Sequence, residues 1–266
     1  MRLLGSIALR LSRSRLSVWL YEKSLLKQVS QMPMPNHIGI IMDGNRRWAE
    51  LKGLDKSLGH VFGAKKVDEV LKWCHELGIK ILTLYVLSTE NLKRPREEIQ
   101  LLLGLFRDKL AEIMDKRILH ENQTRFKVIG RRDLIPPDIM KYVEKIEKET
   151  EKYSLHFLNI AFAYGGRAEI VDAVRSIARD VSKKLLDPEE INEETISNRL
   201  YTAYLPKPDP DLIIRTSGEE RLSNFLLWQS AYSELVFIDV YWPEFRKIDL
   251  LRAIRTYQKR KRRFGL

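Results

Sequence analysis

Several common features are scarce or missing in this sequence, and each absence excludes a class of protein. Cys74 is the only cysteine among 266 residues, so a disulfide framework and a zinc site of several thiolates are both impossible. No stretch approaches the ~20 apolar residues that a membrane-spanning helix needs. The G-x-x-x-x-G-K-[ST] phosphate loop, a G-x-G-x-x-G after a strand pattern and the G-x-S-x-G nucleophile motif are also absent.

The charge is abundant but uneven. The net charge is +11, yet residues 1–31 hold six Lys or Arg against one acid, and residues 252–266 hold seven against none. The rest of the chain is therefore close to neutral. Basic ends suit non-specific binding to nucleic acid or contact with an anionic membrane surface. With a single cysteine, a reducing compartment is favoured, so we expect a cytoplasmic protein with peripheral membrane contact as a further possibility.

The first 33 residues differ from the remainder, and we treat 1–33 as a basic extension of a domain spanning 34–266. Leu4, Ile7 and Leu11 fall at helical spacing in a segment rich in Arg and Ser. Three interpretations stay open: an interfacial amphipathic helix, an organelle transit peptide, and a helix packed on the domain.

Six short apolar runs alternate with helical patterns. They lie at 37–42, 79–87, 126–129, 155–161, 212–214 and 235–240. Continuous apolar runs of this length are typical of strands buried on both faces of a parallel sheet. The alternation predicts an α/β fold, a single domain whose central, mostly parallel sheet is flanked by helices.

Helical spacing of apolar residues marks the segments between these runs. One such segment is defined by Val67, Val70, Leu71 and Cys74. Pro95 opens a second helix, with Glu97 and Glu98 in the first turn, where acids suit the helix dipole. Two more are predicted at 139–153 and 168–186.

Polar residues follow the first predicted strand directly, as 43–48 (DGNRRW). Ligands of open parallel sheets bind beyond the carboxyl ends of the strands. Asp43 there can hold a magnesium ion, and Gly44 allows backbone amides to approach a phosphate closely. Arg46 and Arg47 offer forked donors to phosphate oxygens. Taken alone, a β-turn with a solvated arginine pair explains the segment as well.

Two further strand ends combine small polar residues with arginine. Residues 88–94 (STENLKR) follow the second run, although Ser88 and Asn91 there are also ordinary turn and cap residues. Residues 215–224 (RTSGEERLSN) follow the fifth run and suit a second diphosphate better than a surface salt-bridge loop. Three such strand ends are hard to explain by packing, so they predict a site for diphosphates.

Two isolated residues are ambiguous. Glu234 precedes the last apolar run, where an acid would either complete a metal site with Asp43 or serve as an ion-pair partner. His60 follows Gly59, and a lone histidine is more often structural than catalytic.

Taken in order, these motifs resemble the cis-prenyltransferases, the family of undecaprenyl and dehydrodolichyl diphosphate synthases. The matching segments are HIGIIMDGNRRWA, Gly59-His60, LTLYVLSTENLKRP, LNIAFAYGGRAEI, DLIIRTSGEERLSNFLLWQSAYSEL and RRFG. They cover about residues 34 to 265, and the Asp-Asp-x-x-Asp signature of trans-prenyltransferases is absent. The resemblance implies a magnesium-dependent enzyme that adds isopentenyl diphosphate units to farnesyl or geranylgeranyl diphosphate. Its product would be a long polyprenyl diphosphate, the precursor of a glycosyl carrier lipid.

The resemblance also implies roles for individual residues. Asp43 would hold magnesium on the primer's diphosphate, Glu234 would share the ion, and Ser88 and Asn91 would assist proton removal. The primer would be surrounded by Gly44, Asn45, Arg46, Arg47, Trp48, Lys56, His60 and Arg94. Isopentenyl diphosphate would be bound by Arg215, Arg221 and Ser223, and the remaining substrate contacts would be Ser88, Thr89, Glu90 and Leu222.

The family is typically dimeric, and Arg263-Phe264-Gly265 resembles a tail that completes the partner's site, so we expect a homodimer. Arg46 and Leu92 depart from the common bacterial version, which has Gly and Trp there. With the long extension, Arg46 favours the archaeal or eukaryotic branch.

Two other classes of protein compete with this interpretation. A non-catalytic partner subunit would lose Asp43 or the paired arginines, and a nucleic-acid binder would gather basic residues on a core face. The chain keeps Asp43 and the paired arginines, and its core is near neutral.

The growing product would thread an apolar tunnel between the sheet and the helices that begin near Pro95 and Gly166. Leu87 lies either on the tunnel wall or in the closed core.

Overall fold

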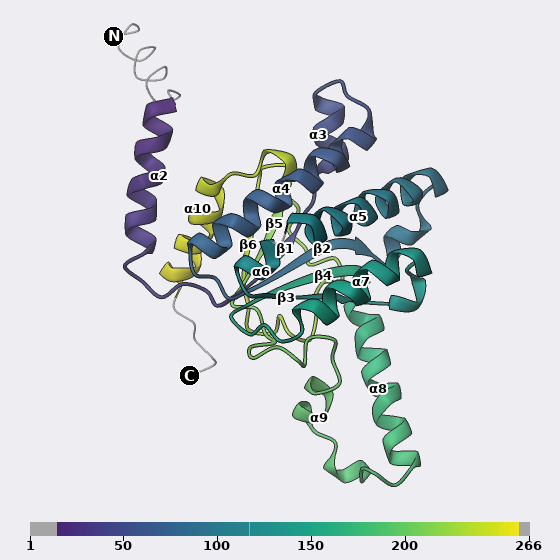
Figure 1. The fold of residues 1–266 in the computed structure, drawn as a ribbon. Coiled ribbons are helices and arrows are strands. Elements are labelled where there is room, and N and C mark those ends of the chain that lie inside the picture. Colours follow the sequence, from purple (N-terminus) through teal and green to yellow (C-terminus); the bar gives the residue numbers. More distant parts are fainter. Residues whose placement is uncertain (1–14, 117, 261–266) are drawn as a thin grey trace, which may run out of the picture.

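The structure is a computed structural model that describes residues 15–116 and 118–260. Its strands are β1 (His37–Ile41), β2 (Ile81–Ser88), β3 (Thr124–Ile129), β4 (His156–Tyr164), β5 (Leu212–Thr216) and β6 (Glu234–Ile238). They form one sheet in the order β3-β4-β2-β1-β5-β6, and all neighbouring pairs are parallel (Figure 1). The predicted α/β fold with a central parallel sheet is confirmed.

Helices surround this sheet. They are α2 (Arg15–Val29), α3 (Asn45–Leu51), α4 (Lys56–Glu76), α5 (Arg96–Lys116), α6 (Ile118–Glu121), α7 (Pro137–Thr150), α8 (Gly166–Ser182), α9 (Glu193–Ser197) and α10 (Lys247–Lys259). The predicted helix after Pro95 is α5, and its first turn carries the two expected acids. None of the helices in the described part of the chain has the length and hydropathy to cross a membrane.

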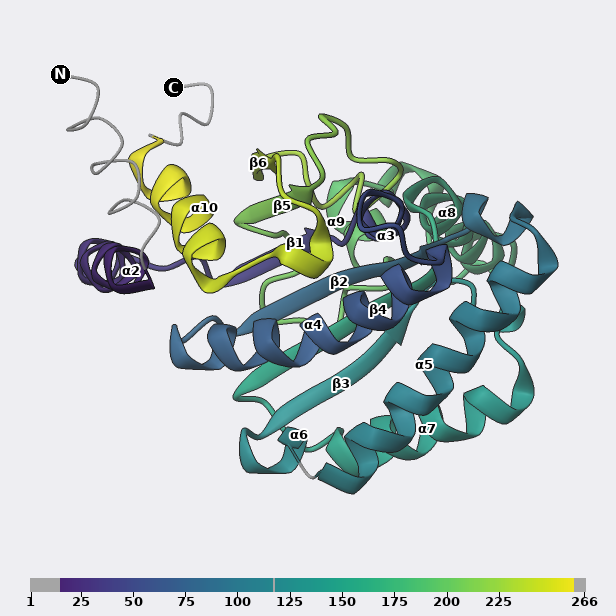
Figure 2. The same ribbon diagram turned by 90° about the horizontal axis from the view of Figure 1, so that it is seen from above.

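The two faces of the sheet are covered differently, because successive strand residues point to opposite sides. Ile40 and Leu84 belong to the main core, which includes buried residues of α4, α5, α7 and α10. Ile41 and Tyr85 belong to a smaller core that includes Phe225 and is built against irregular chain. Figure 2 shows α4, α5 and α7 together on one side of the sheet and α8 on the other.

The start of the described chain packs on the domain. Leu25 and Val29 of α2 are fully buried in the main core, and α2 contacts α10. The side chain of Gln258 in α10 donates hydrogen bonds to backbone carbonyls at the end of α2 and just beyond it. Residues 15–29 therefore form a helix that packs on the domain. The stripe of Leu4, Ile7 and Leu11 and the tail Arg263–Gly265 lie outside the described residues.

Candidate functional site

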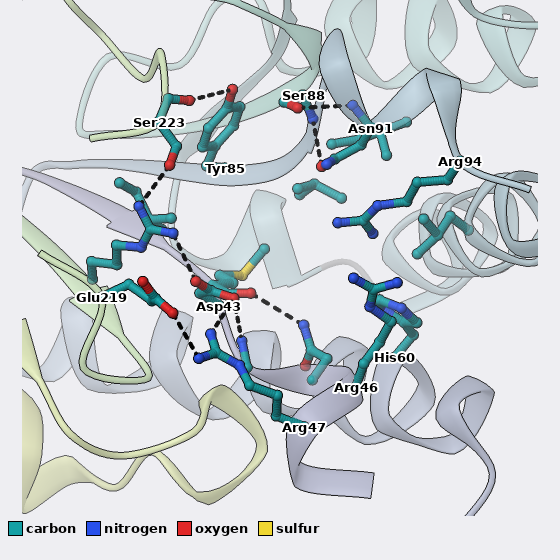
Figure 3. A pocket seen from close by; sticks show the side chains of 18 of the residues that line it. Asp43, Arg46, Arg47, His60, Tyr85, Ser88, Asn91, Arg94, Glu219 and Ser223 are labelled. Atoms are coloured by element: carbon teal, nitrogen blue, oxygen red, sulfur yellow. Dashed lines mark hydrogen bonds and ion pairs between the residues drawn. The ribbon is translucent and has the colours of Figure 1, made fainter. Parts of the chain in front are cut away.

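A polar cavity of about 540 Å³ opens at the carboxyl ends of β1, β2 and β5 (Figure 3). Three segments that are far apart in the sequence meet there. The predicted site residues that line it are Asp43, Gly44, Asn45, Arg46, Arg47, His60, Ser88, Asn91, Arg94, Arg215, Arg221 and Ser223. The convergence follows from the topology, because β1 lies between β2 and β5 in the sheet.

The loop after β1 is fixed by its neighbours. The Asp43 amide donates to Thr216 Oγ1 at 2.9 Å, and the Gly44 amide donates to Asp43 Oδ1 at 2.6 Å. Gly44 has φ +98°, and a Cβ there would lie 2.5 Å from Tyr241 Cδ1 and 2.9 Å from Ser217 Cβ. Only glycine fits this left-handed, crowded position without strain. The turn therefore aims the Asp43 carboxylate into the cavity.

Two arginines hold Asp43 ionised. Arg215 Nη2 lies 2.8 Å from Asp43 Oδ2, and Arg47 Nη2 lies 3.3 Å from Asp43 Oδ1. Burial opposes ionisation, but the hydrogen bond and charge of Arg215, together with Arg47, lower the pKa of Asp43 below its ordinary value. The site therefore contains a permanent carboxylate among cations.

Arg215 is the most buried of these cations, with 5% of its side chain exposed. Its Nη1 donates to Ser223 Oγ at 2.7 Å and to the Arg221 carbonyl at 2.5 Å. Its Nε is buried without a hydrogen-bond partner in the described protein. A buried donor without a partner is costly, so a bound anion would stabilise this group.

Glu219 is a site residue that the sequence analysis missed. Its carboxylate accepts from Arg47 Nη1 at 2.9 Å and from Arg221 Nη1 at 2.5 Å. These two arginines lower the pKa of Glu219. Glu219 thus links Arg47, which is predicted to bind the primer, with Arg221, which is predicted to bind isopentenyl diphosphate. The signal in the sequence was an acid between Arg215 and Arg221.

Glu98 is a second missed residue near the site. Its carboxylate accepts from Arg94 Nη1 at 2.9 Å and from Arg46 Nη1 at 3.4 Å, and it lies 3.5 Å from His60 Nε2. Burial, with Arg94 and Arg46, lowers the pKa of His60 although Glu98 opposes the shift. The imidazole is therefore neutral at pH 7. The sequence assigns Glu98 only to the helix dipole, yet it also accepts from two arginines and lies against His60, whose Nε2 has no hydrogen-bond partner among the described residues.

Ser88 and Asn91 hold each other in place. The backbone amide of Asn91 donates to Ser88 Oγ at 3.0 Å, and the backbone amide of Ser88 donates to Asn91 Oδ1 at 3.2 Å (Figure 3). The register of β2 against β4 shifts on both sides of Leu87, so the strand is irregular there. Both Leu87 and Ser88 consequently border the polar cavity.

Six predicted residues lie outside the cavity wall. They are Trp48, Lys56, Thr89, Glu90, Leu222 and Glu234. Trp48 packs on Phe62, and Lys56 pairs with Glu50 at the surface.

Glu234 requires a correction. It is the first residue of β6 and pairs in register with Leu212, whereas Asp43 follows the end of β1. In a parallel sheet these are opposite edges, about five residues or ~17 Å apart along the strands. Glu234 instead binds Arg260 Nη1 at 2.8 Å. It cannot share an ion with Asp43 within one chain.

A second, narrower cavity of about 110 Å³ adjoins the polar one. Met42, Asn45, His60, Val86 and Leu102 line both. The second cavity is mainly apolar and lies between the sheet and helices α4 and α5. The expected apolar passage beside the helix after Pro95 is present. The expectation that the helix after Gly166 also forms it is wrong, because no α8 residue lines it.

The donor set fits magnesium only together with a phosphate ligand. Among the described residues, no three His, Cys, Asp or Glu side chains come together as a metal cage. Magnesium is ordinarily bound through one or two carboxylates, waters and substrate phosphates. The ionised Asp43 in an arginine-rich cavity supplies one such carboxylate beside a place for phosphate.

Comparison with known proteins decides the family. The family model described as "Putative undecaprenyl diphosphate synthase" matches residues 41–265. The chain belongs to the cis-prenyltransferase family. The predicted resemblance is confirmed, and this cis-prenyltransferase is an enzyme that transfers prenyl groups to make a polyprenyl diphosphate.

Individual relatives cover nearly the whole cis-prenyltransferase chain. A Methanocaldococcus jannaschii protein, "Tritrans,polycis-undecaprenyl-diphosphate synthase (geranylgeranyl-diphosphate specific)", is 53% identical over 92% of this chain and 88% of its own. A Thermus thermophilus "Isoprenyl transferase" is 54% identical over 96% of this chain and 98% of its own. The structure of lavandulyl diphosphate synthase from Lavandula x intermedia, in complex with dimethylallyl diphosphate, aligns with a TM-score of 0.85 at 36% identity. That alignment covers 88% of this chain and 99% of the other.

Proposed function

We propose that this cis-prenyltransferase adds isopentenyl diphosphate units to geranylgeranyl diphosphate in a magnesium-dependent reaction. The product would be a long polyprenyl diphosphate, the precursor of a glycosyl carrier lipid. The observation that carries the proposal is one polar cavity with two groups of arginines, which opens into an apolar cavity. The name of the archaeal relative supports the geranylgeranyl primer.

The primer's diphosphate is assigned to the group formed by Arg46, Arg47, Arg94 and neutral His60. Their guanidinium groups supply forked donors that match phosphate oxygens. Glu98 and Glu219 hold these groups in the unliganded chain and release them when the diphosphate binds. The primer's hydrocarbon tail then enters the adjoining apolar cavity past Met42 and Val86.

The diphosphate of isopentenyl diphosphate is assigned to Arg215, Arg221 and Ser223. Arg215 already holds Ser223 Oγ, so the two donors are pre-oriented, and the unpartnered Arg215 Nε is available to an oxygen. Fixing both substrates in one cavity replaces a bimolecular encounter by a positioned reaction.

The arginines also act during the reaction. As the primer's diphosphate leaves, negative charge grows on its oxygens, and the fixed guanidinium groups stabilise that charge. Asp43 is the residue that would hold magnesium, which when bound would supply Lewis-acid stabilisation of the leaving diphosphate. Each addition ends with the loss of a proton from the isopentenyl unit. We assign the assistance of this proton removal to the Ser88–Asn91 pair, because mutual hydrogen bonds hold the two residues at the end of β2.

Assembly and location form a separate element of the proposal. We propose a homodimer with peripheral membrane contact in the cytoplasm. The resemblance of Arg263–Gly265 supports the dimer, and exposed Trp19 and Leu20 on α2 support the membrane contact. Light scattering and vesicle sedimentation of the full chain test these two points.

Product analysis tests the activity. Purified full chain is incubated with labelled isopentenyl diphosphate, magnesium and either farnesyl or geranylgeranyl diphosphate. We expect long polyprenyl products, with a higher kcat/KM for the geranylgeranyl primer. A preference for farnesyl diphosphate would overturn the primer assignment, and no chain elongation with any primer would overturn the function.

A further inference from the structure

The wall of the apolar cavity contains a charged pair that a hydrocarbon chain does not need. Lys109 of α5 is 15% exposed, and its Nζ lies 2.5 Å from Asp68 Oδ2 of α4. The same Nζ lies 2.8 Å from Glu112 Oε2. Lys109 and Asp68 line the cavity among mainly apolar side chains. Asp68 is 44% exposed, but the largely buried Lys109 ammonium needs its carboxylate partners, so the pair joins the two helices.

The depth of this pair can be measured from the diphosphate end of the same helices. His60 of α4 and Glu98 of α5 meet there at 3.5 Å. Asp68 lies eight residues beyond His60, and Lys109 lies eleven beyond Glu98. At 1.5 Å per helical residue, these steps are about 12 and 17 Å.

Those distances correspond to a small number of prenyl units. Each unit adds four chain bonds, and an extended chain advances about 1.2 Å per bond, so one unit spans ~5 Å. The pair therefore lies about three units from the diphosphate, near the tail of a three- or four-unit primer. Every longer product has to pass this depth.

The pair also joins two helices that diverge. Figure 2 shows α4 and α5 close at their first turns and further apart toward their ends. Lys109 reaches from α5 to Asp68 of α4. Beyond Lys109, the cavity wall continues with Ile113, Ile118 and Phe126. A chain that grows past the primer's length thus meets a polar bridge on one side and apolar wall on the other.

We propose that the Lys109–Asp68 ion pair limits product length by bridging α4 and α5 in the wall of the apolar cavity at the depth of the primer's tail. The inference rests on the proposed function, because it concerns the chain that the enzyme elongates. The bridge confines the growing chain to the narrow space over the sheet. A chain that grows past this depth has to move the largely buried Lys109 away from Asp68, which is 44% exposed, and this cost disfavours products that extend beyond the pair.

Lys109→Met tests the proposal, because methionine keeps an unbranched apolar stem and removes the charge. With the primer that the wild-type enzyme prefers, we expect the main product to lengthen by at least one prenyl unit. Asp68→Asn should lengthen it in the same way, and combining the two should add little, because both remove one contact. Lys109→Arg keeps the pair and should keep the wild-type product.

Lys247→Met is the matched control. Lys247 of α10 pairs with Glu76 of α4 at 2.6 Å, and the two side chains are 20% and 40% exposed, close to the 15% and 44% of Lys109 and Asp68. Neither residue lines the apolar cavity. This variant should lower the melting temperature to a similar extent and leave product length unchanged.

The outcomes separate the inference from the function it rests on. Unchanged or shorter products from Lys109→Met and Asp68→Asn, while the wild-type enzyme elongates normally, would overturn the inference whatever the melting temperatures are. If one variant does not fold, the other gives the result. A wild-type enzyme that elongates no primer would instead remove the proposed function itself.

Discussion

The two edges of the sheet both contain buried polar groups, but they satisfy them differently. At the amino edge, His37 Nδ1 donates to the Lys207 carbonyl and its Nε2 accepts from Thr83, which accepts from Asn159. Asp211 accepts from the amides of Asn36 and His37 and from Lys207. His37, Thr83, Asn159 and Asp211 are each at most 2% exposed, whereas Lys207 is 40% exposed. Asn36 Oδ1 is buried there without a hydrogen-bond partner among the described residues, but Asn36 lines neither of the two cavities.

At the carboxyl edge, the unpaired buried groups face a cavity. Arg215 Nε and Asn45 Oδ1 are buried without a partner in the described protein, and both residues line the polar cavity. Its ion pairs are arginine–carboxylate contacts that a diphosphate can replace. Burial of polar groups alone therefore does not mark a site. A site is marked by buried donors and acceptors that have no hydrogen-bond partner and face a cavity.

Asp43→Ala should give the largest effect and the sharpest contrast between the edges. We expect turnover to fall by at least about 100-fold, because the cavity loses its permanent carboxylate and candidate magnesium ligand. Circular dichroism should show an unchanged fold, since Asp43 adds no apolar packing. Asp43→Asn, which keeps the size, should be equally inactive. Near-wild-type turnover at saturating magnesium would contradict the assignment.

Leu87→Ala separates packing from chemistry at the carboxyl edge. Leu87 is 1% exposed, belongs to the main core and does not line the apolar cavity. We therefore expect a loss of about 2–5 kcal/mol in the free energy of unfolding and no change in product length. Denaturant unfolding beside chromatography of the products checks both. Longer products with an unchanged midpoint would instead place Leu87 on the path of the chain.

His37 should make the amino edge sensitive to acid. Burial lowers the pKa of His37 to about 4, although the Lys207 carbonyl and Asp211 oppose the shift. A histidine whose pKa is lowered by folding contributes stability above its unfolded pKa, near 6.5, and loses it as pH falls toward the folded value. We expect a loss of about 3 kcal/mol between pH 6.5 and 4.

Urea unfolding as a function of pH measures this loss. His37→Gln should unfold more easily at neutral pH but should lack this component of the pH slope. An identical slope in the variant would assign the acid sensitivity to other groups, such as Asp211.

Much of the fold followed from periodicity, because strands buried on both faces are continuous apolar runs. The runs at 37–42 and 212–214 correspond to β1 and β5. The expected closeness of Glu234 to Asp43 within one chain failed because of strand direction. Asp43 follows its strand and Glu234 begins its strand, so parallel pairing puts them at opposite edges.

The details of the site depended on contacts that spacing does not reveal. Glu219 reaches Arg47 across 172 residues, and Glu98 reaches Arg46 across 52. The irregular end of β2, which brings Leu87 and Ser88 to one cavity, had no signal in the pattern of apolar residues. The roles of the individual residues remain predictions for the experiments described.

Arg215→Ala and Arg221→Ala refine the carboxyl edge into two pockets. Each should weaken the binding of isopentenyl diphosphate by roughly tenfold to a hundredfold, and the binding of the primer by less, since a charge-assisted contact contributes about 1.5–3 kcal/mol. Arg221 is 61% exposed and should lie at the lower end. Steady-state KM values for both substrates check this. A larger loss for the primer would reverse the two pockets.

The most direct test compares one ion pair from each edge. Arg215 pairs with Asp43 at the carboxyl edge, and Lys207 pairs with Asp211 at the amino edge. Binding of isopentenyl diphosphate in the presence of magnesium is measured by calorimetry for the wild type, Arg215→Met and Lys207→Met. We predict that Arg215→Met loses at least tenfold in affinity, whereas Lys207→Met binds normally and melts at a lower temperature. Normal binding by Arg215→Met, or equal loss in both folded variants, would contradict the assignment of the diphosphate site to the carboxyl edge.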